Sequence, residues 1–118
     1  MRRTILFVDD ELINLYVLEK RFEGEYNVLT AESAEDAISK IEANKDILDA
    51  IISDLKMPGM DGLELINRIK PEVLDVPCFL LTGFDRVEQT DEVSGKIQHM
   101  FKKPFDYNEI DSKLKEVL

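Results

Sequence analysis

The stretch IISDLKMPGMDG, residues 51–62, joins an apolar run to a carboxylate, Asp54, and soon afterwards to a Met-Pro-Gly turn signal. Consecutive apolar residues that end in a turn are typical of a strand buried on both faces. A charge at the end of such a strand needs a partner, because burying an isolated charge is costly. The same pattern occurs earlier, where Asp9 and Asp10 follow the apolar run of residues 4–8.

Apolar runs rich in strand formers alternate along the chain with segments of helical periodicity. The predicted strands are residues 4–8, 26–31, 48–53, 78–81 and 97–101. Each is followed by a predicted helix, and several strands are apolar on both faces. A strand–helix unit repeated five times in this way predicts an α/β fold, in which helices cover a parallel sheet.

The helices are predicted from their apolar stripes and their end signals. The stripe Leu12, Leu15, Leu18, Phe22 ends before Gly24, and the third helix ends before Pro71. Ser33 is a predicted N-cap, with Asp36 in the capping-box position three residues later. The polar segment 85–95 predicts a short, weakly held helix. In the first and last helices, Tyr16 and Tyr107 are predicted to be packing positions.

Length and charge restrict the class of protein. The 118 residues fit one domain, and no internal repeat or linker marks a boundary within them, so we expect a single domain spanning residues 1–118 with no output domain. The formal net charge of −10 argues against direct nucleic-acid binding. The single cysteine, Cys78, excludes an internal disulfide and fits a reducing cytoplasm. No apolar run is long enough for a membrane helix.

The polar residues that interrupt this pattern stand at the carboxyl ends of the predicted strands. Asp9 and Asp10 follow the first strand, and Asp54, Thr82 and Lys103 end the third, fourth and fifth. Ligands of open parallel sheets bind beyond these strand ends. The aspartates would repel one another unless a proton or a cation compensates them. Because the donors are all oxygens, Mg²⁺ fits best, and a nearby ammonium and hydroxyl suit a phosphoryl group.

Four motifs together resemble the receiver domain of two-component response regulators. They are LFVDDE at residues 6–11, SDLKMPGMDG at 53–62, LTG at 81–83 and KPF at 103–105. They occur in the family's order and spacing, and the match covers the whole chain. The resemblance implies a flavodoxin-like (βα)5 doubly wound open sheet with strand order 2-1-3-4-5.

The resemblance also implies a role for each site residue. Asp54 would accept a phosphoryl group from a histidine kinase or a histidine phosphotransfer protein, forming an aspartyl phosphate. Mg²⁺ would be held by Asp54, Asp10 and the backbone carbonyl of Lys56, with Asp9 acting mainly through water.

The remaining implied roles concern the phosphoryl oxygens, the turns and the switch. Thr82 and Lys103 would bind the oxygens, Lys103–Pro104 would be a cis peptide, and Asp61-Gly62 would shape the turn into the next helix. The domain would be a signalling phosphoacceptor and not an enzyme, beyond its own phosphotransfer and autodephosphorylation. Phosphorylation would switch a partner-binding surface around the fourth helix, fifth strand and fifth helix.

The chain departs from the family pattern at the switch position. The family usually has Tyr or Phe three residues before the site lysine, where this chain has Met100. Methionine is flexible, so the expected switch with Thr82 is a repacking and not a ring rotation. Lys56 and Phe84 occupy the two positions that tune dephosphorylation in the family. The downstream partner, a separate protein or a covalently linked output domain, and a homodimer are left open.

Purely structural roles for these residues, and two other classes of protein, are alternatives to this interpretation. Asp9 or Asp10 could simply cap the first helix. A phosphohydrolase with an aspartate nucleophile would need a second aspartate two residues after Asp54, where this chain has Lys56. A nucleotide-binding domain would need a glycine-rich phosphate loop, which is absent from the sequence. Cys78 and His99 are expected to be a buried small residue and a surface residue, respectively.

Overall fold

The computed structural model describes residues 2–71, 73, 75–83 and 97–118. It contains one parallel sheet with strand order β2-β1-β3-β4-β5, the order that the resemblance implies. The strands are β1 (Thr4–Val8), β2 (Asn27–Ala31), β3 (Leu48–Asp54), β4 (Cys78–Thr82) and β5 (His99–Lys102). Pairing is parallel throughout, so the carboxyl ends of the strands share one edge of the sheet.

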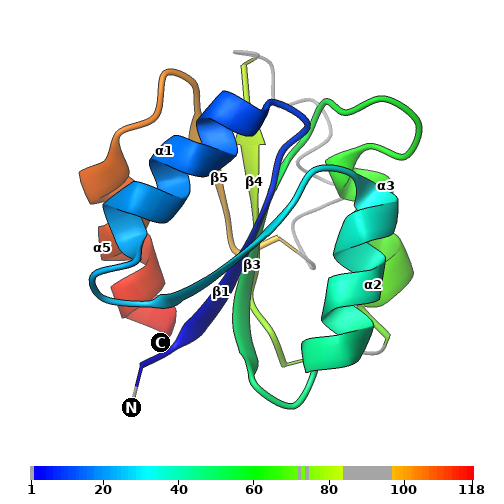
Figure 1. Ribbon diagram of the computed structural model, residues 1–118, viewed down its shortest axis with the longest axis horizontal. Coiled ribbons are helices and arrows are strands. Elements are labelled where there is room, and N and C mark those ends of the chain that lie inside the picture. The colour runs from blue at the N-terminus through cyan, green and yellow to red at the C-terminus, as the bar shows by residue number, and fades with distance from the viewer. Residues whose placement is uncertain (1, 72, 74, 84–96) are drawn as a thin grey trace.

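Four helices are described, with two on each face of the sheet (Figure 1). They are α1 (Leu12–Phe22), α2 (Ala34–Asn44), α3 (Gly62–Ile69) and α5 (Tyr107–Val117). Each has between 8 and 11 residues. Within the described part of the chain, no helix is long and apolar enough to cross a membrane.

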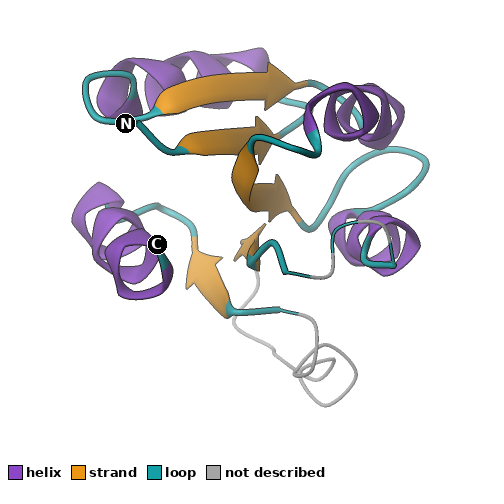
Figure 2. Ribbon diagram, turned by 90° about the horizontal axis from the view of Figure 1, so that it is seen from below, coloured by secondary structure: helices purple, strands orange, loops and turns teal. Residues whose placement is uncertain are grey.

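The two faces of the sheet bury separate hydrophobic clusters, because successive strand residues point to opposite faces. Phe7 and Phe79 belong to the cluster that also contains residues of α1 and α5, whereas Leu6 and Leu80 belong to the cluster with α2 and α3. Figure 2 shows the helices lying against both faces. The prediction that several strands are apolar on both faces is confirmed, and the sheet lies between two layers of helices.

Polar side chains cap the starts of α2 and α3. Ser33 Oγ accepts a hydrogen bond from the Asp36 amide at 3.0 Å, which confirms the predicted N-cap of α2. The carboxylate of Asp36, however, accepts from the Glu32 amide at 3.2 Å and not from Ser33. The predicted capping box is therefore shifted by one residue. A complete capping box is present instead between Asp61 and Glu64, at the start of α3.

Other element boundaries were predicted within a few residues. The second strand starts at Asn27 and not at Tyr26, whose hydroxyl donates to Asp111 of α5 at 2.9 Å. The fifth strand starts at His99 and not at Ile97, because pairing with β4 begins where His99 meets Phe79. The predicted helix at 85–95 lies outside the described residues.

The packing predicted for α1 is partly wrong. Leu15, Leu18 and Phe22 are buried, but Leu12 is 62% exposed and Tyr16 is 60% exposed. Each helical residue turns the side chain by about 100°, so Tyr16 lies a quarter-turn away from the buried Leu15. Its aromatic character suggested packing, but its position on the helix decides its exposure. Tyr107 of α5 is half-buried and packs against the cluster on the α1–α5 face.

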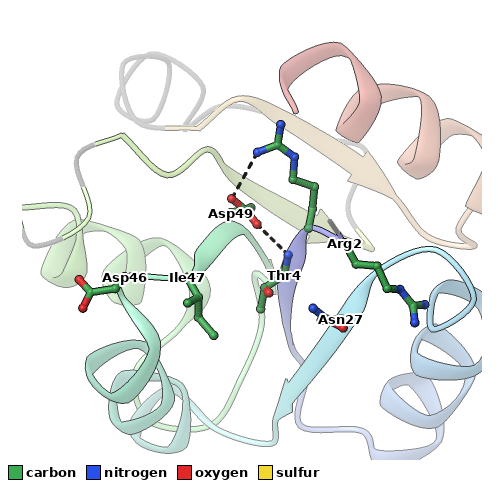
Figure 3. A pocket seen from close by; sticks show the side chains of 7 residues that line it. Arg2, Thr4, Asn27, Asp46, Ile47 and Asp49 are labelled. Atoms are coloured by element: carbon green, nitrogen blue, oxygen red, sulfur yellow. Dashed lines mark hydrogen bonds and ion pairs between the residues drawn. The ribbon is translucent and has the colours of Figure 1, made fainter.

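A β-bulge marks the amino end of the sheet. Thr4 pairs with Leu48 but Ile5 pairs with Ala50, so Asp49 is passed over in the register. Its carboxylate accepts a hydrogen bond from the Thr4 amide at 2.8 Å (Figure 3). It also lies 3.7 Å from the Arg3 guanidinium. Asp49 thus supplies the acceptor that the shifted backbone lacks, at the sheet end opposite the aspartates of the candidate site.

Candidate functional site

Strand order and register gather the predicted site residues at the carboxyl edge of the sheet. Asp54 is the last residue of β3 and pairs with Leu81, so Thr82 lies one residue further along the neighbouring strand. Asp9 follows β1, whose last residue, Val8, pairs with Ser53. Because β3 lies between β1 and β4, Asp54 stands at the centre of this edge.

Three carboxylates converge there. Oxygens of Asp9, Asp10 and Asp54 all lie within 4.8 Å of one another. Asp9 is 0% exposed and Asp54 3% exposed, whereas Asp10 is open to solvent. No histidine or cysteine belongs to this group among the described residues. A cluster of oxygen donors that carries excess negative charge fits a hard cation such as Mg²⁺.

Lys103 supplies a positive charge beside the cluster. Its Nζ lies 3.2 Å from Asp54 Oδ2 and 3.9 Å from Glu11 Oε1. The ammonium also lies over the ring of Phe105, 5.6 Å from the centroid. The Lys103–Pro104 peptide is cis. Lys102, its neighbour in sequence, is exposed.

Burial and neighbouring charges act strongly on Asp54. Burial, together with the negative charge of Asp9, raises the pKa of the Asp54 carboxyl from 3.8 to about 6. Its hydrogen bond and ion pair with Lys103 oppose this rise, and Asp10 adds a smaller increase in the pKa. At neutral pH the Asp54 carboxylate is therefore ionised but poorly solvated, as a nucleophile requires.

We expect Asp54→Asn to stabilise the metal-free protein at pH 7 by about 3 kcal/mol. The folded state holds its proton on Asp54 up to about pH 6, whereas the unfolded chain releases it near 3.8. The Asp54 carboxyl therefore contributes its full stabilisation of the folded state below about pH 4. That contribution is lost as the pH rises through about 6. Asparagine removes that loss, so the difference between variant and wild type should shrink toward zero on acidification. Urea unfolding in EDTA at several pH values measures this difference in the free energy of unfolding.

Asp46→Asn is the matched control, because Asp46 is an exposed aspartate in the loop before β3. It should leave the free energy of unfolding nearly unchanged at both ends of the pH range. A gain for Asp54→Asn that is the same at pH 4 and pH 7 would contradict the assignment of a raised pKa to Asp54.

Asp9 is held by two donors. Its Oδ1 accepts the Glu11 amide at 2.9 Å, and its Oδ2 accepts Nδ2 of Asn14 at 3.1 Å. The N-cap of α1 is Glu11, which makes no side-chain capping bond. Asp9 therefore orders the chain before α1, but helix capping does not account for the convergence of Asp9 with Asp10 and Asp54.

The loop after β3 is shaped by packing and by one close approach. Met57 is buried in the α2–α3 cluster, and Gly59 has a φ of 76°, a conformation that favours glycine. The Gly62 amide donates to the Leu55 carbonyl at 2.9 Å. A Cβ at Gly62 would lie 2.3 Å from the Asp54 carbonyl oxygen. The backbone of α3 thus rests directly on the residue that carries the central carboxylate.

The other residues singled out in the sequence lie around this centre or away from it. Thr82 is buried, with 1% of its surface exposed. Met100 is half-buried against the α2–α3 cluster. Phe84 lies outside the described residues. Cys78 is fully buried, as predicted, and the half-exposed His99 lies 4.0 Å from Glu109 of α5.

Comparisons with known proteins agree with this geometry. The family model described as the response regulator receiver domain matches residues 5–115. The chain is 33% identical to the alkaline phosphatase synthesis transcriptional regulatory protein PhoP of Bacillus subtilis, covering 100% of this chain and 49% of PhoP. It is 31% identical to sporulation initiation phosphotransferase F of the same organism, covering 100% of this chain and 95% of that protein.

A solved structure adds information on the site of a relative. The response regulator TrrA of Thermotoga maritima, in complex with Mg²⁺-BeF, is 32% identical, with a TM-score of 0.87 over 98% of this chain and 99% of that one. Several curated relatives are longer, and the chain spans about half or less of their length.

Proposed function

This chain belongs to the family of response regulator receiver domains, the phosphoacceptor domains of two-component systems, and from this premise we propose that Asp54 accepts the phosphoryl group. One observation carries the proposal. The Asp54 carboxylate is buried at the end of the central strand, 3.2 Å from an ammonium and within 4.8 Å of two further carboxylates. The site therefore combines a nucleophile, Asp54, with an ammonium for phosphoryl oxygens and carboxylate oxygens for a metal.

The proposed reaction is a direct phosphoryl transfer. An oxygen of Asp54 attacks the phosphorus of a phosphohistidine, the phosphorus–nitrogen bond breaks, and the imidazole leaves with the bonding electron pair. The product is an aspartyl phosphate. Lys103 binds one phosphoryl oxygen through its ammonium, and Thr82 binds another through its hydroxyl. Lys103 already lies against Asp54, so little movement is needed to reach an oxygen bonded to it.

Mg²⁺ is the cofactor that the site fits. Asp10, Asp54 and the Lys56 backbone carbonyl would hold the ion directly, with Asp9 acting mainly through water. When bound, the ion offsets the negative charge of the phosphoryl oxygens beside the carboxylates. Support comes from the all-oxygen donor set and from TrrA, whose structure is a complex with Mg²⁺-BeF.

Residues 1–118 are proposed to act as one receiver domain in the cytoplasm, without binding nucleic acid or membranes directly. The phosphodonor is a histidine kinase or a histidine phosphotransfer protein. The output is a downstream protein or a covalently linked output domain, and a homodimer is compatible with this role. The switch couples Thr82 to the half-buried Met100 of β5. Autodephosphorylation is tuned by Lys56 and by Phe84, the latter outside the described residues.

The test is the intact mass of the protein after incubation with acetyl phosphate, with and without Mg²⁺. We expect a gain of one phosphoryl group that requires Mg²⁺. No gain, under conditions in which TrrA is labelled, would overturn the proposed function.

The exposed surface of α1 is the expected docking site for the protein that donates the phosphoryl group. Leu12, Ile13 and Tyr16 are 62%, 78% and 60% exposed, and they form an apolar patch on the helix that starts two residues after Asp10. A donor histidine must reach Asp54, so the donor must cover this edge of the sheet. We expect Ile13→Lys to slow phosphotransfer from a histidine kinase about 10-fold, as for a central interface residue. Labelling by acetyl phosphate should be unchanged.

Ile47→Lys is the control, because Ile47 is 57% exposed but precedes β3 at the opposite end of the sheet. It adds the same charge in place of the same exposed side chain. Equal rates of phosphotransfer from the kinase to Ile13→Lys and Ile47→Lys would show that the α1 patch is not part of the docking surface.

A further inference from the structure

Asn14 belongs to the carboxylate network and has no role in the proposed phosphotransfer. It lies in the first turn of α1 and is half-buried. Its Nδ2 donates to Asp9 Oδ2 at 3.1 Å, while a second contact, to Glu11 Oε1, is longer at 3.5 Å and exposed. The short bond joins α1 to the fully buried member of the carboxylate cluster.

The Asp9 carboxylate needs this bond more than most aspartates do. It is fully buried, and it lies close to two groups of the same charge. The Glu11 amide serves only one of its oxygens. Without Asn14, the second oxygen would lose this hydrogen-bond donor, and a buried charge with an unsatisfied oxygen is costly. The terminal torsion of an aspartate is also broad, so one donor leaves the plane of the carboxylate poorly fixed.

We propose that Asn14 is a positioning residue, which fixes the orientation of the Asp9 carboxylate for binding of the divalent cation. This inference rests on the proposed function. Two neutral donors, one from the backbone and one from a side chain, hold the two Asp9 oxygens from different directions. The Asp9 carboxylate is then held in one orientation beside the Asp10 and Asp54 carboxylates. Partners that orient ligand groups in this way typically change metal affinity by about 10- to 100-fold when they are removed.

The competing explanation is that Asn14 only stabilises the start of α1. That role predicts a loss of folding stability and no change in cation binding. The two explanations therefore differ in a quantity that can be measured without any phosphodonor.

The experiment titrates Mg²⁺ alone into an isotope-labelled protein of residues 1–118 and follows its backbone amide signals by NMR. Urea unfolding in EDTA is measured on the same variants. Asn14→Ala should weaken Mg²⁺ binding about 10-fold. Asn14→Gln, which keeps the amide donor, should recover a large part of the affinity. Asn44→Ala is the control. Asn44 is also a helix asparagine whose side-chain amide donates a hydrogen bond, but its acceptor is the Lys40 carbonyl, in the last turn of α2.

An affinity of Asn14→Ala equal to that of Asn44→Ala would overturn the proposal, even if Asn14→Ala were the less stable protein. Equal weakening in Asn14→Ala and Asn14→Gln would also overturn it, because the amide would then not be the active group. Wild-type protein that binds Mg²⁺ tightly relative to Asn14→Ala, but gains no phosphoryl group from acetyl phosphate, would overturn the proposed function while supporting the role of Asn14.

Discussion

Asp54→Asn is expected to abolish phosphorylation, so that the intact mass stays unchanged under conditions in which the wild type gains one phosphoryl group. The asparagine amide has nearly the shape of the carboxylate but is a far weaker nucleophile. Its side chain can still meet Lys103, which lies 3.2 Å from Asp54 in the wild type. The variant is also expected to be more stable than the wild type at pH 7. A loss of labelling therefore cannot be assigned to unfolding.

The control for this experiment keeps the site and changes an aspartate elsewhere. Asp46→Asn should be labelled like the wild type, because Asp46 is exposed in the loop before β3. Peptide mapping of the labelled wild type should place the phosphoryl group on Asp54. Labelling that persists in Asp54→Asn and maps to Asp9 or Asp10 would show that the acceptor has been misassigned.

Much of the fold could be predicted from local patterns. Alternating apolar runs and helical stripes are local properties of the chain, and they placed all five strands within two residues of their observed starts. The order of the strands is not a local property. Nothing in the periodicity says that β3 lies between β1 and β4, and the order came from the resemblance of four motifs.

Individual side chains in the site were harder to predict, because their environment depends on distant segments. Asp9 and Asp10 are neighbours in sequence, but one is fully buried and the other exposed. Adjacent residues at a strand end point in different directions, and only the register with β3 decides which one is enclosed. Asn14 was missed for the same reason. Its polar side chain in the first turn of an apolar helix was a signal, but its partner became known only from the structure.

The role of Gly62 was also only partly foreseen. The sequence suggested that Asp61-Gly62 shapes a turn, and Asp61 does cap α3. The structure adds that Gly62 is the point of contact between α3 and the backbone of Asp54. A close backbone approach leaves no mark on hydrophobic periodicity, since glycine is common in turns for other reasons.

We therefore expect Gly62→Ala to destabilise the protein by about 2–3 kcal/mol and to reduce labelling by acetyl phosphate about 10-fold or more. The new Cβ would lie 2.3 Å from the Asp54 carbonyl oxygen and 3.1 Å from Leu55 Cα. Both are backbone atoms, so no side chain can rotate away, and either α3 or the end of β3 must shift. Alanine favours helices by up to about 1 kcal/mol over glycine, which offsets only part of the strain.

Gly24→Ala is the matched control for this last prediction. A Cβ at Gly24, in the turn after α1, meets no atom within 4 Å. The same chemical change should therefore leave both the free energy of unfolding and the rate of labelling close to wild type. Urea unfolding and intact mass over time measure the two quantities on the same samples. If Gly62→Ala is as stable and as readily labelled as Gly24→Ala, close packing of α3 on the Asp54 backbone does not hold the phosphoacceptor in place. If Gly62→Ala loses both, the position of the Asp54 carboxylate is set by the helix that follows it as well as by the strand that carries it.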